Sequence, residues 1–275
     1  MLFVKPMARS RVDRGASPKL GKSTEMHEVI EFPAGGYRFI KGSLAYSLGV
    51  VALPGFRLER VRFQAPTSLD DAFRRMADII ADAKRPASAL AACELRSPAQ
   101  FTEAGFRVFN ERYTALLRDF GWSEVGGTNP VARTNVCPST QALSDARIYA
   151  FSYTVEDPGA RPSFVLAGAV DLMTGDKDLR DLIIALDQID VAGIRKKARH
   201  ALDDLERRLS LLGFDWSMTT GNGLYCVHDI FQALTDEIAV RGAAPAGITW
   251  HLCRPPISGL EFEIDTRSVP VERTI

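Results

Sequence analysis

The sequence predicts an α+β fold in which one unit occurs twice, each copy a mostly antiparallel sheet with two helices on one face. The chain has 275 residues, about twice the common domain size of roughly 100–150 residues. Hydrophobic residues make up 46% and charged residues 25%, as in an average soluble globular protein. The same order of strands and helices appears on both sides of a turn-forming segment at 156–159. We therefore expect a flexible tail at 1–26, a first domain at 27–156 and a second at 160–275.

The first half begins with three predicted strands, which are short apolar or alternating runs at 37–40, 46–52 and 56–63. Ser68 can cap a helix, because Asp71 follows three residues later and apolar residues then recur at the spacing of one helix face until Pro86 ends it. The remaining predicted elements are a buried strand at 87–95, a helix at 98–120 that ends at Gly121, and strands at 131–137 and 147–155.

The second half repeats this order. A strand at 163–170 precedes a helix whose apolar stripe runs from Ile194 to Leu212 and ends at Gly213. A strand at 223–227, a helix at 230–238 and strands at 248–252 and 260–265 complete it. The cysteines recur as well, with Cys93 and Cys226 in the strand before the second helix and Cys137 and Cys253 in the strand after it.

Composition excludes several classes of function. Lys plus Arg and Asp plus Glu both number 34, so no net positive field favours a nucleic-acid partner. The chain has no apolar run of about 18 residues or more and its apolar N-terminal stretch is too short for a signal peptide, which predicts a cytoplasmic protein without a membrane partner. With no CxxC pair and no histidines four residues apart, we expect reduced, buried thiols, no metal and no cofactor.

Motifs of one known family occur in both halves, at 106–113 (FRVFNERY), 129–136 (NPVARTNV), 167–171 (AGAVD), 174–175 (TG), 208–213 (RLSLLG) and 260–265 (LEFEID). Each half resembles a domain of the reactive-intermediate deaminase family, the YjgF/UK114 group. The resemblance implies a chorismate-mutase-like fold and a homo-oligomer, a trimer above all, with ligand pockets between units. The tandem arrangement resembles the two-domain deaminases of aromatic catabolism.

In that family an arginine on the penultimate strand grips a substrate carboxylate, and a glutamate on the last strand positions or activates water. The resemblance implies the first role for Arg133, in the first copy only, and the second role for Glu263, in the second copy only. Tyr149 stands at the glutamate position of the first copy, and Asn135 replaces a frequent cysteine. If the pocket lies between the unlike copies, Arg133 and Glu263 meet in one composite site.

Each of these residues also has a structural interpretation. Arg133 suits a carboxylate because guanidinium offers two parallel donors and stays charged, but a structural salt bridge is the alternative. Glu263 shares one strand face with Glu261 and Asp265, and this face is either solvated or lines a pocket where burial raises the carboxyl pKa. Tyr149 either hydrogen-bonds substrate or packs.

Three further residues, Arg96, Asn110 and Gly168, complete the candidate site. Arg96 and Ser97 directly follow a strand and either hold a second carboxylate or begin a helix. Asn110 matches a helix asparagine of the family, which implies that it braces a loop or the arginine. The candidate catalytic residues are thus Glu263 and Tyr149, and the candidate substrate-binding residues are Arg133, Asn135, Arg96, Asn110 and Gly168.

These residues and the resemblance predict a cofactor-independent deaminase. Its expected substrate is a small enamine or imine dicarboxylate of the 2-aminomuconate type, with or without a chlorine substituent, because water attack on the C=N carbon needs a carboxylate anchor and a proton-handling group. Loss of one arginine and one glutamate across the copies leaves a non-catalytic binding module as an alternative. A chorismate-cleaving enzyme of the same superfamily is a second alternative. RNA cleavage is disfavoured, because the net charge is zero.

Overall fold

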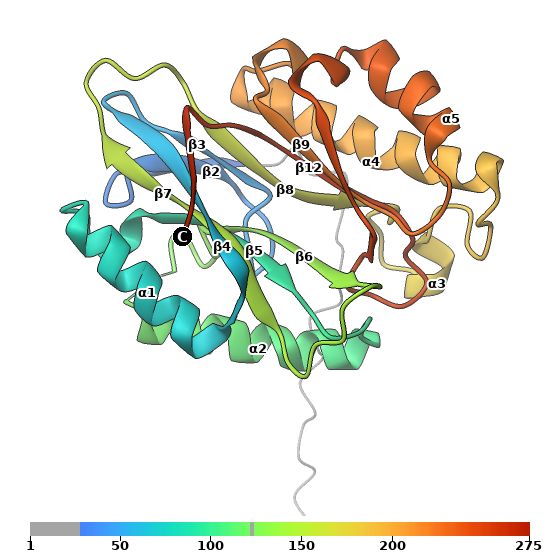
Figure 1. The fold of residues 1–275 in the computed structure, drawn as a ribbon, viewed down its shortest axis with the longest axis horizontal. Coiled ribbons are helices and arrows are strands. Elements are labelled where there is room, and N and C mark those ends of the chain that lie inside the picture. Colours follow the sequence, from blue (N-terminus) through green and yellow to red (C-terminus); the bar gives the residue numbers. More distant parts are fainter. Residues whose placement is uncertain (1–27, 122–123) are drawn as a thin grey trace, which may run out of the picture.

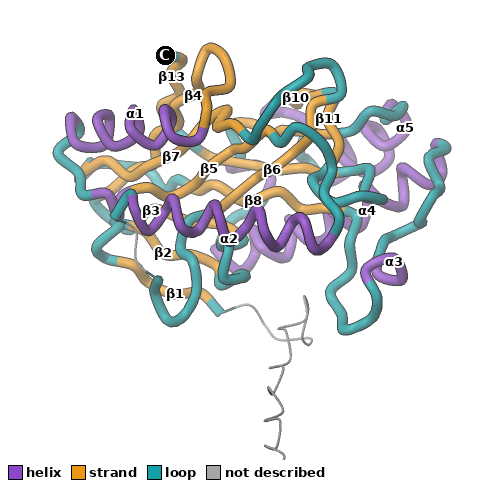
Figure 2. Tube along the Cα trace, turned by 90° about the horizontal axis from the view of Figure 1, so that it is seen from below, coloured by secondary structure: helices purple, strands orange, loops and turns teal. Residues whose placement is uncertain are grey.

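The computed structural model describes residues 28–121 and 124–275, and the predicted tail at 1–26 lies outside them. The α+β class is confirmed. Two mostly antiparallel sheets lie face to face between two layers of helices, as Figures 1 and 2 show. None of the helices in the described part of the chain has both the length and the apolar character that crossing a bilayer requires.

Six strands form the first sheet, in the order β11-β6-β5-β7-β4-β13. Helices α1 (Leu69–Asp82) and α2 (Glu103–Asp119) cover its outer face and share one apolar core with it. Ser68 caps α1 as predicted, since its hydroxyl accepts a hydrogen bond from the Asp71 N–H at 3.3 Å. The strands are β4 (Phe56–Ser68), β5 (Leu90–Arg96), β6 (Ala132–Pro138), β7 (Arg147–Glu156), β11 (Cys253–Arg254) and β13 (Val271–Thr274).

Seven strands form the second sheet, in the order β1-β2-β3-β8-β12-β9-β10. Helix α4 (Val191–Leu212) covers its outer face, together with a helical segment that starts as α5 (Phe231–Ala233) and continues as π- and 3-10 turns to Arg241. Gly213 ends α4 in the left-handed region, with φ 87°, as predicted. The strands are β1 (Val29–Phe32), β2 (Tyr37–Ile40), β3 (Gly49–Ala52), β8 (Phe164–Val170), β9 (Gly221–Tyr225), β10 (Ile248–His251) and β12 (Glu263–Ser268). The remaining short helices are α3 (Leu179–Leu182) and the 3-10 turns Ala87–Ala89, Trp216–Met218 and Ala244–Ala246.

The two halves exchange strands, which the sequence did not predict. Strands β1 to β3 belong to the predicted first domain, but β3 pairs with β8, Gly49 lying opposite Leu166. At the other end of the chain, β13 pairs in parallel with β4. The expected boundary at 156–160 falls between β7 and β8 and therefore does not separate the two sheets. A period-two pattern determines which face of a strand is buried but not which strand it pairs with.

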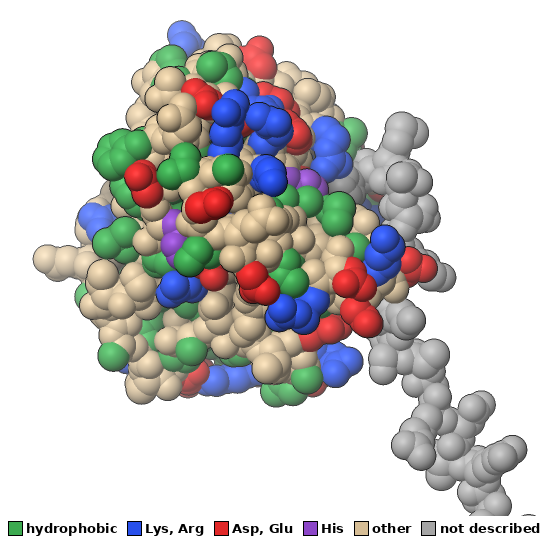
Figure 3. All heavy atoms as spheres, turned by 90° about the vertical axis from the view of Figure 1, so that its right-hand side faces the viewer, with side chains coloured by type: hydrophobic (Ala, Val, Ile, Leu, Met, Phe, Trp, Pro, Cys, Tyr) green, Lys and Arg blue, Asp and Glu red, His purple; other side chains and the backbone are tan. Residues whose placement is uncertain are grey.

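The inner faces of the two sheets pack against each other through a third apolar cluster, which includes Phe39, Val50, Leu58, Ala132 and Ala167. Buried charged residues from both halves, among them Glu94, Arg133, Glu263 and Asp265, accompany this cluster. The outer surface mixes both signs of charge with scattered apolar side chains, as the face in Figure 3 shows. All four cysteines are free and buried, as expected.

Candidate active site

Arg133 lies on β6 and is 4% exposed, inside a cage of aromatic rings. Its guanidinium carbon lies 4.5 to 5.6 Å from the ring centroids of Tyr46, Tyr113, Phe106 and Phe109. Burial lowers the pKa of Arg133, and no ion pair or hydrogen-bond partner for Nη1 occurs among the described residues. The structural salt bridge considered for Arg133 is therefore absent from this part of the chain. The cage fixes the guanidinium and leaves one nitrogen for a ligand.

Glu263 is the first residue of β12 and is 3% exposed, so the solvated-face interpretation is wrong. Burial, and then the nearby charge of Asp265, raise its pKa well above the usual range, while Arg96 and Arg133 act in the opposite direction. Gly168 on β8 makes room for this carboxyl, because a Cβ there would collide with Oε1 of Glu263. Arg133 of the first half and Glu263 of the second are thus close enough to affect each other's pKa.

Arg96 ends β5 and is also buried. Its guanidinium carbon lies 4.0 Å from the ring centroid of Tyr149 and 5.4 Å from that of Tyr225. Nη1 donates to the Leu95 carbonyl at 3.0 Å, and Nη2 has no partner within residues 28–121 and 124–275. Tyr149 of β7 therefore packs on an arginine, and its ring also meets His251 edge-on at 5.8 Å.

Asn135 lies between Ser97 and Glu263 and forms hydrogen bonds with both. Its Oδ1 accepts a hydrogen bond from the Ser97 hydroxyl at 2.8 Å, and its backbone hydrogen bond to Glu263 lowers the pKa of that carboxyl. Asn110 lies on α2 next to Phe109 of the arginine cage, and its buried Oδ1 has no partner in the described part of the chain. The expected bracing contact from Asn110 Oδ1 is therefore not formed there.

Sequence reasoning missed several groups around this site. His251 stacks on Tyr225 with ring centroids 5.1 Å apart, and burial followed by the charge of Arg96 lowers its pKa to about 4, so it is neutral at neutral pH. Asp265 accepts hydrogen bonds from the Thr134 and Tyr225 hydroxyls. Only the alternation of Glu263 with Asp265 along one strand could have indicated the second carboxyl.

Five buried polar atoms without hydrogen-bond partners in the described chain belong to candidate residues of this site: Arg96 Nη2, Asn110 Oδ1, Arg133 Nη1, Asn135 Nδ2 and Glu263 Oε2. Leaving a buried polar group unpaired costs free energy, so native proteins rarely do so without a functional reason. Three of the atoms are N–H donors, two of them cationic, which suits a ligand carrying carboxylates. No group of three or more metal-binding side chains lies together in the described residues.

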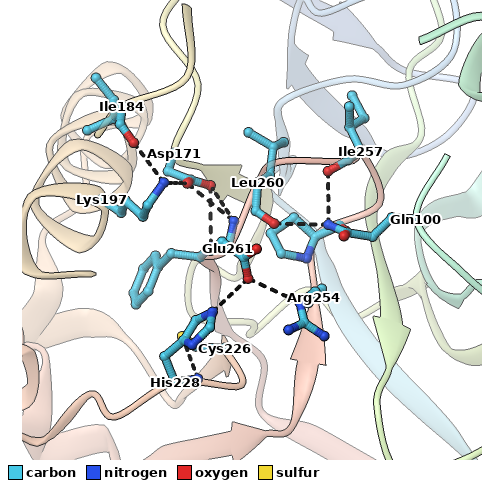
Figure 4. Close-up of polar contacts among 12 residues, drawn as sticks. Gln100, Asp171, Ile184, Lys197, Cys226, His228, Arg254, Ile257, Leu260 and Glu261 are labelled. Carbon is cyan, nitrogen blue, oxygen red and sulfur yellow. Dashed lines mark hydrogen bonds and ion pairs between the residues drawn. The ribbon is translucent and has the colours of Figure 1, made fainter. Parts of the chain in front are cut away.

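A second polar cluster holds the start of β12 in place, as Figure 4 shows. Lys197 of α4 is fully buried and donates to Asp171 Oδ2 at 2.8 Å and to the Ile184 carbonyl at 2.7 Å. The Asp171 carboxylate in turn accepts from the backbone N–H groups of Glu261 and Phe262, at 3.2 and 3.3 Å. These contacts fix the backbone immediately before Glu263, and they explain why β12 begins at 263 rather than at the predicted 260.

Lys197→Met should therefore lower the free energy of unfolding by about 3–5 kcal/mol, because it leaves the buried Asp171 charge without its cation. Urea unfolding followed by far-UV circular dichroism measures this change. Lys196→Met is the matched control, since the neighbouring lysine is exposed and donates a hydrogen bond to Gln188 Oε1 at 3.3 Å, with no ion pair among the described residues. Equal stability of the two variants would contradict the role given to Lys197.

Two comparisons of the sequence with known proteins both match deaminases. A family model described as "2-aminomuconate deaminase CnbZ" matches residues 29–273. The chain is 39% identical over 252 residues to 2-amino-5-chloromuconate deaminase of Comamonas testosteroni, covering 91% of this chain and all of that protein.

Solved structures also show partial similarity. A chorismatase has a TM-score of 0.47 at 11% identity, covering 88% of this chain and 79% of its own. A YjgF/YER057c/UK114 family member from Mycobacterium tuberculosis has a TM-score of 0.26 at 20% identity, covering 39% and 78%. The assignment rests on the two sequence matches, and by them the chain belongs to the 2-aminomuconate deaminase CnbZ family.

Proposed function

We propose that this protein hydrolyses a small enamine or imine dicarboxylate of the 2-aminomuconate type and releases ammonia. One observation carries the proposal. Arg96 and Arg133 are buried, each is held by aromatic rings, each keeps an N–H without a partner in the described chain, and both act on the pKa of Glu263. Two fixed cations whose charges act on the same carboxyl group suit a substrate with a carboxylate at each end. The family and its relative support the same substrate class.

In this mechanism Arg133 binds the carboxylate next to the amino-bearing carbon, and Arg96 binds the distal one. Glu263 donates its proton to the enamine carbon, which converts the C=C–N group into an iminium ion. The resulting Glu263 carboxylate takes a proton from a water molecule as its oxygen attacks the C=N carbon. Transfer of that proton to the nitrogen of the carbinolamine lets ammonia leave, and the Glu263 carboxylate takes up the hydroxyl proton as the carbonyl of the 2-oxo acid forms, so that Glu263 is protonated again. One water is consumed for each ammonia released.

We further propose that the enzyme works in the cytoplasm as a homo-oligomer, a trimer by resemblance to the YjgF/UK114 group. The edge strand β10 supports an interface between chains, because Trp250 and the following Leu252 are exposed there and Phe231 packs edge-on against Trp250 at 6.1 Å. Light scattering measures the mass directly.

The direct test mixes the purified protein with freshly generated 2-aminomuconate and follows ammonia release against buffer alone across a range of pH. We expect faster release that depends on enzyme concentration and is unaffected by a chelator. Chorismate serves as the second substrate. Turnover of chorismate without ammonia release from 2-aminomuconate would contradict the proposal and indicate a chorismate-cleaving enzyme. Ligand-induced thermal stabilisation without any turnover would indicate a binding protein.

A further inference from the structure

We propose that Glu263 and Asp265 form a carboxyl pair in which Asp265 keeps the negative charge and Glu263 keeps the proton, so that Asp265 is a positioning residue that prepares Glu263 as a proton donor. The consequence for catalysis rests on the proposed function. The protonation state itself does not, and it can be measured without substrate.

The pair is a consequence of strand geometry. Residues two apart on β12 point to the same side of the sheet, and both carboxyls are buried, Glu263 at 3% and Asp265 at 7% exposure. The charge of Asp265 raises the pKa of Glu263, and two carboxyls buried on one strand face ionise together only at a cost, so one of them holds a proton over a wide range of pH. The hydrogen bonds around each carboxyl decide which one.

Asp265 is surrounded by donors. Its Oδ2 accepts from the Thr134 hydroxyl at 2.8 Å and from the Tyr225 hydroxyl at 2.9 Å, and its Oδ1 accepts from the Gly223 N–H at 3.1 Å. The Thr134 oxygen itself receives the Gly168 N–H at 3.1 Å, which leaves its own proton for Asp265. Three donors stabilise the charged form of a carboxyl.

Glu263 has much less support for a charge. Its Oε2 has no hydrogen-bond partner in the described residues, and the backbone of Asn135 provides a single hydrogen bond. A neutral carboxyl tolerates an unpaired oxygen at far lower cost than a carboxylate does. Donor count and burial therefore both place the proton on Glu263.

The charged surroundings are consistent with this division. The titratable or charged groups that act on Glu263 are Arg96 of β5, Arg133 and Cys137 of β6, Cys253 of β11 and Asp265 of β12. Those that act on Asp265 are Glu94 of β5, Tyr225 of β9, Arg267 and Glu263 of β12. Burial and then the charge of Glu94 raise the pKa of Asp265, and Arg267 acts in the opposite direction. Arg60 pairs with Glu94, because its Nε and Nη2 donate to that carboxylate at 2.6 and 2.7 Å. The two arginines beside Glu263 remain available for substrate carboxylates.

Infrared titration of the full-length protein without substrate tests the pair. The difference spectrum between the wild type and Glu263→Gln at pH 7 should contain the C=O band of one protonated carboxyl. In Asp265→Asn this band should disappear at a pH lower by about one unit or more, because the neighbouring negative charge is gone. Glu261→Gln is the control, since that half-buried carboxylate is paired with His228 and Arg254 and its loss should leave the band in place.

Three outcomes would overturn the proposal. The band could be absent from the wild type, it could persist in Glu263→Gln, or it could titrate unchanged in Asp265→Asn. If deamination is found, the alkaline limb of kcat should move to lower pH in Asp265→Asn, whereas a merely structural role would lower kcat without moving the limb. Absence of deamination would contradict the proposed function and would leave the infrared result valid.

Discussion

Arg133→Met is expected to lower kcat/KM for the dicarboxylate substrate by about tenfold to a few hundredfold. A charge-assisted hydrogen bond contributes roughly 1.5–3 kcal/mol, and the loss applies to ground state and transition state alike, so KM should rise. Methionine fills the aromatic cage with apolar volume, and the guanidinium makes no ion pair in the described chain, so folding should survive. Steady-state kinetics and a thermal melt measure the two effects.

Arg112→Met provides the matched control for this variant. Arg112 is an exposed arginine of α2 that pairs with Asp145 at 3.1 Å. Surface pairs of this kind contribute little, so its kcat/KM should stay near the wild-type value. Full activity in Arg133→Met would exclude Arg133 as the carboxylate anchor.

Glu263→Gln should have the opposite kinetic signature, a kcat lower by about 10²- to 10⁴-fold with little change in substrate binding. A positioned acid or base contributes about this factor, and glutamine keeps the shape of the side chain but can neither donate nor accept the reacting proton. Gly168→Ala should reduce kcat in the same way, because the new Cβ displaces the Glu263 carboxyl.

Gly159→Ala is the control for the glycine substitution. Gly159 lies in the exposed β7–β8 connection, and a Cβ there meets nothing closer than 3.8 Å, at Asp157 Oδ1. Comparing the turnover of Glu263→Gln with that of Tyr149→Phe shows which half of the chain carries the reacting group. Full turnover in Glu263→Gln together with inactivity in Tyr149→Phe would move the chemistry to the last strand of the first half.

The sequence predicted local features such as helix caps and helix ends, but it did not predict which distant strands pair. The cap at Ser68 and the helix end at Gly213 depend on neighbours along the chain, and both were predicted. The pairing of β3 with β8 and of β13 with β4 joins segments more than 100 residues apart, which no local pattern encodes. The exchange places strands of the first half beside those of the second, so that the sheet holding Glu263 also holds β1 to β3.

In the candidate site, too, the identity of key residues was predictable from the sequence, whereas their arrangement was not. Arg133 and Glu263 could be selected by resemblance because each retains the family residue type at its own position. Their proximity, the need for glycine at 168 and the buried support from Lys197 all depend on how the sheets pack, and only coordinates reveal them. Asp265 shares a strand face with Glu263, but sequence alternation could not tell a solvated face from a buried one.

A crystal structure of Glu263→Gln bound to muconate, the same dicarboxylate without the amino group, tests the composite site most directly. We expect one carboxylate on Arg133, the other on Arg96, and the carbon next to the first carboxylate beside the residue 263 side chain. A ligand that touches only one half of the chain, or that leaves residue 263 beyond contact of the reacting carbon, would contradict the claim that Arg133 and Glu263 serve one site.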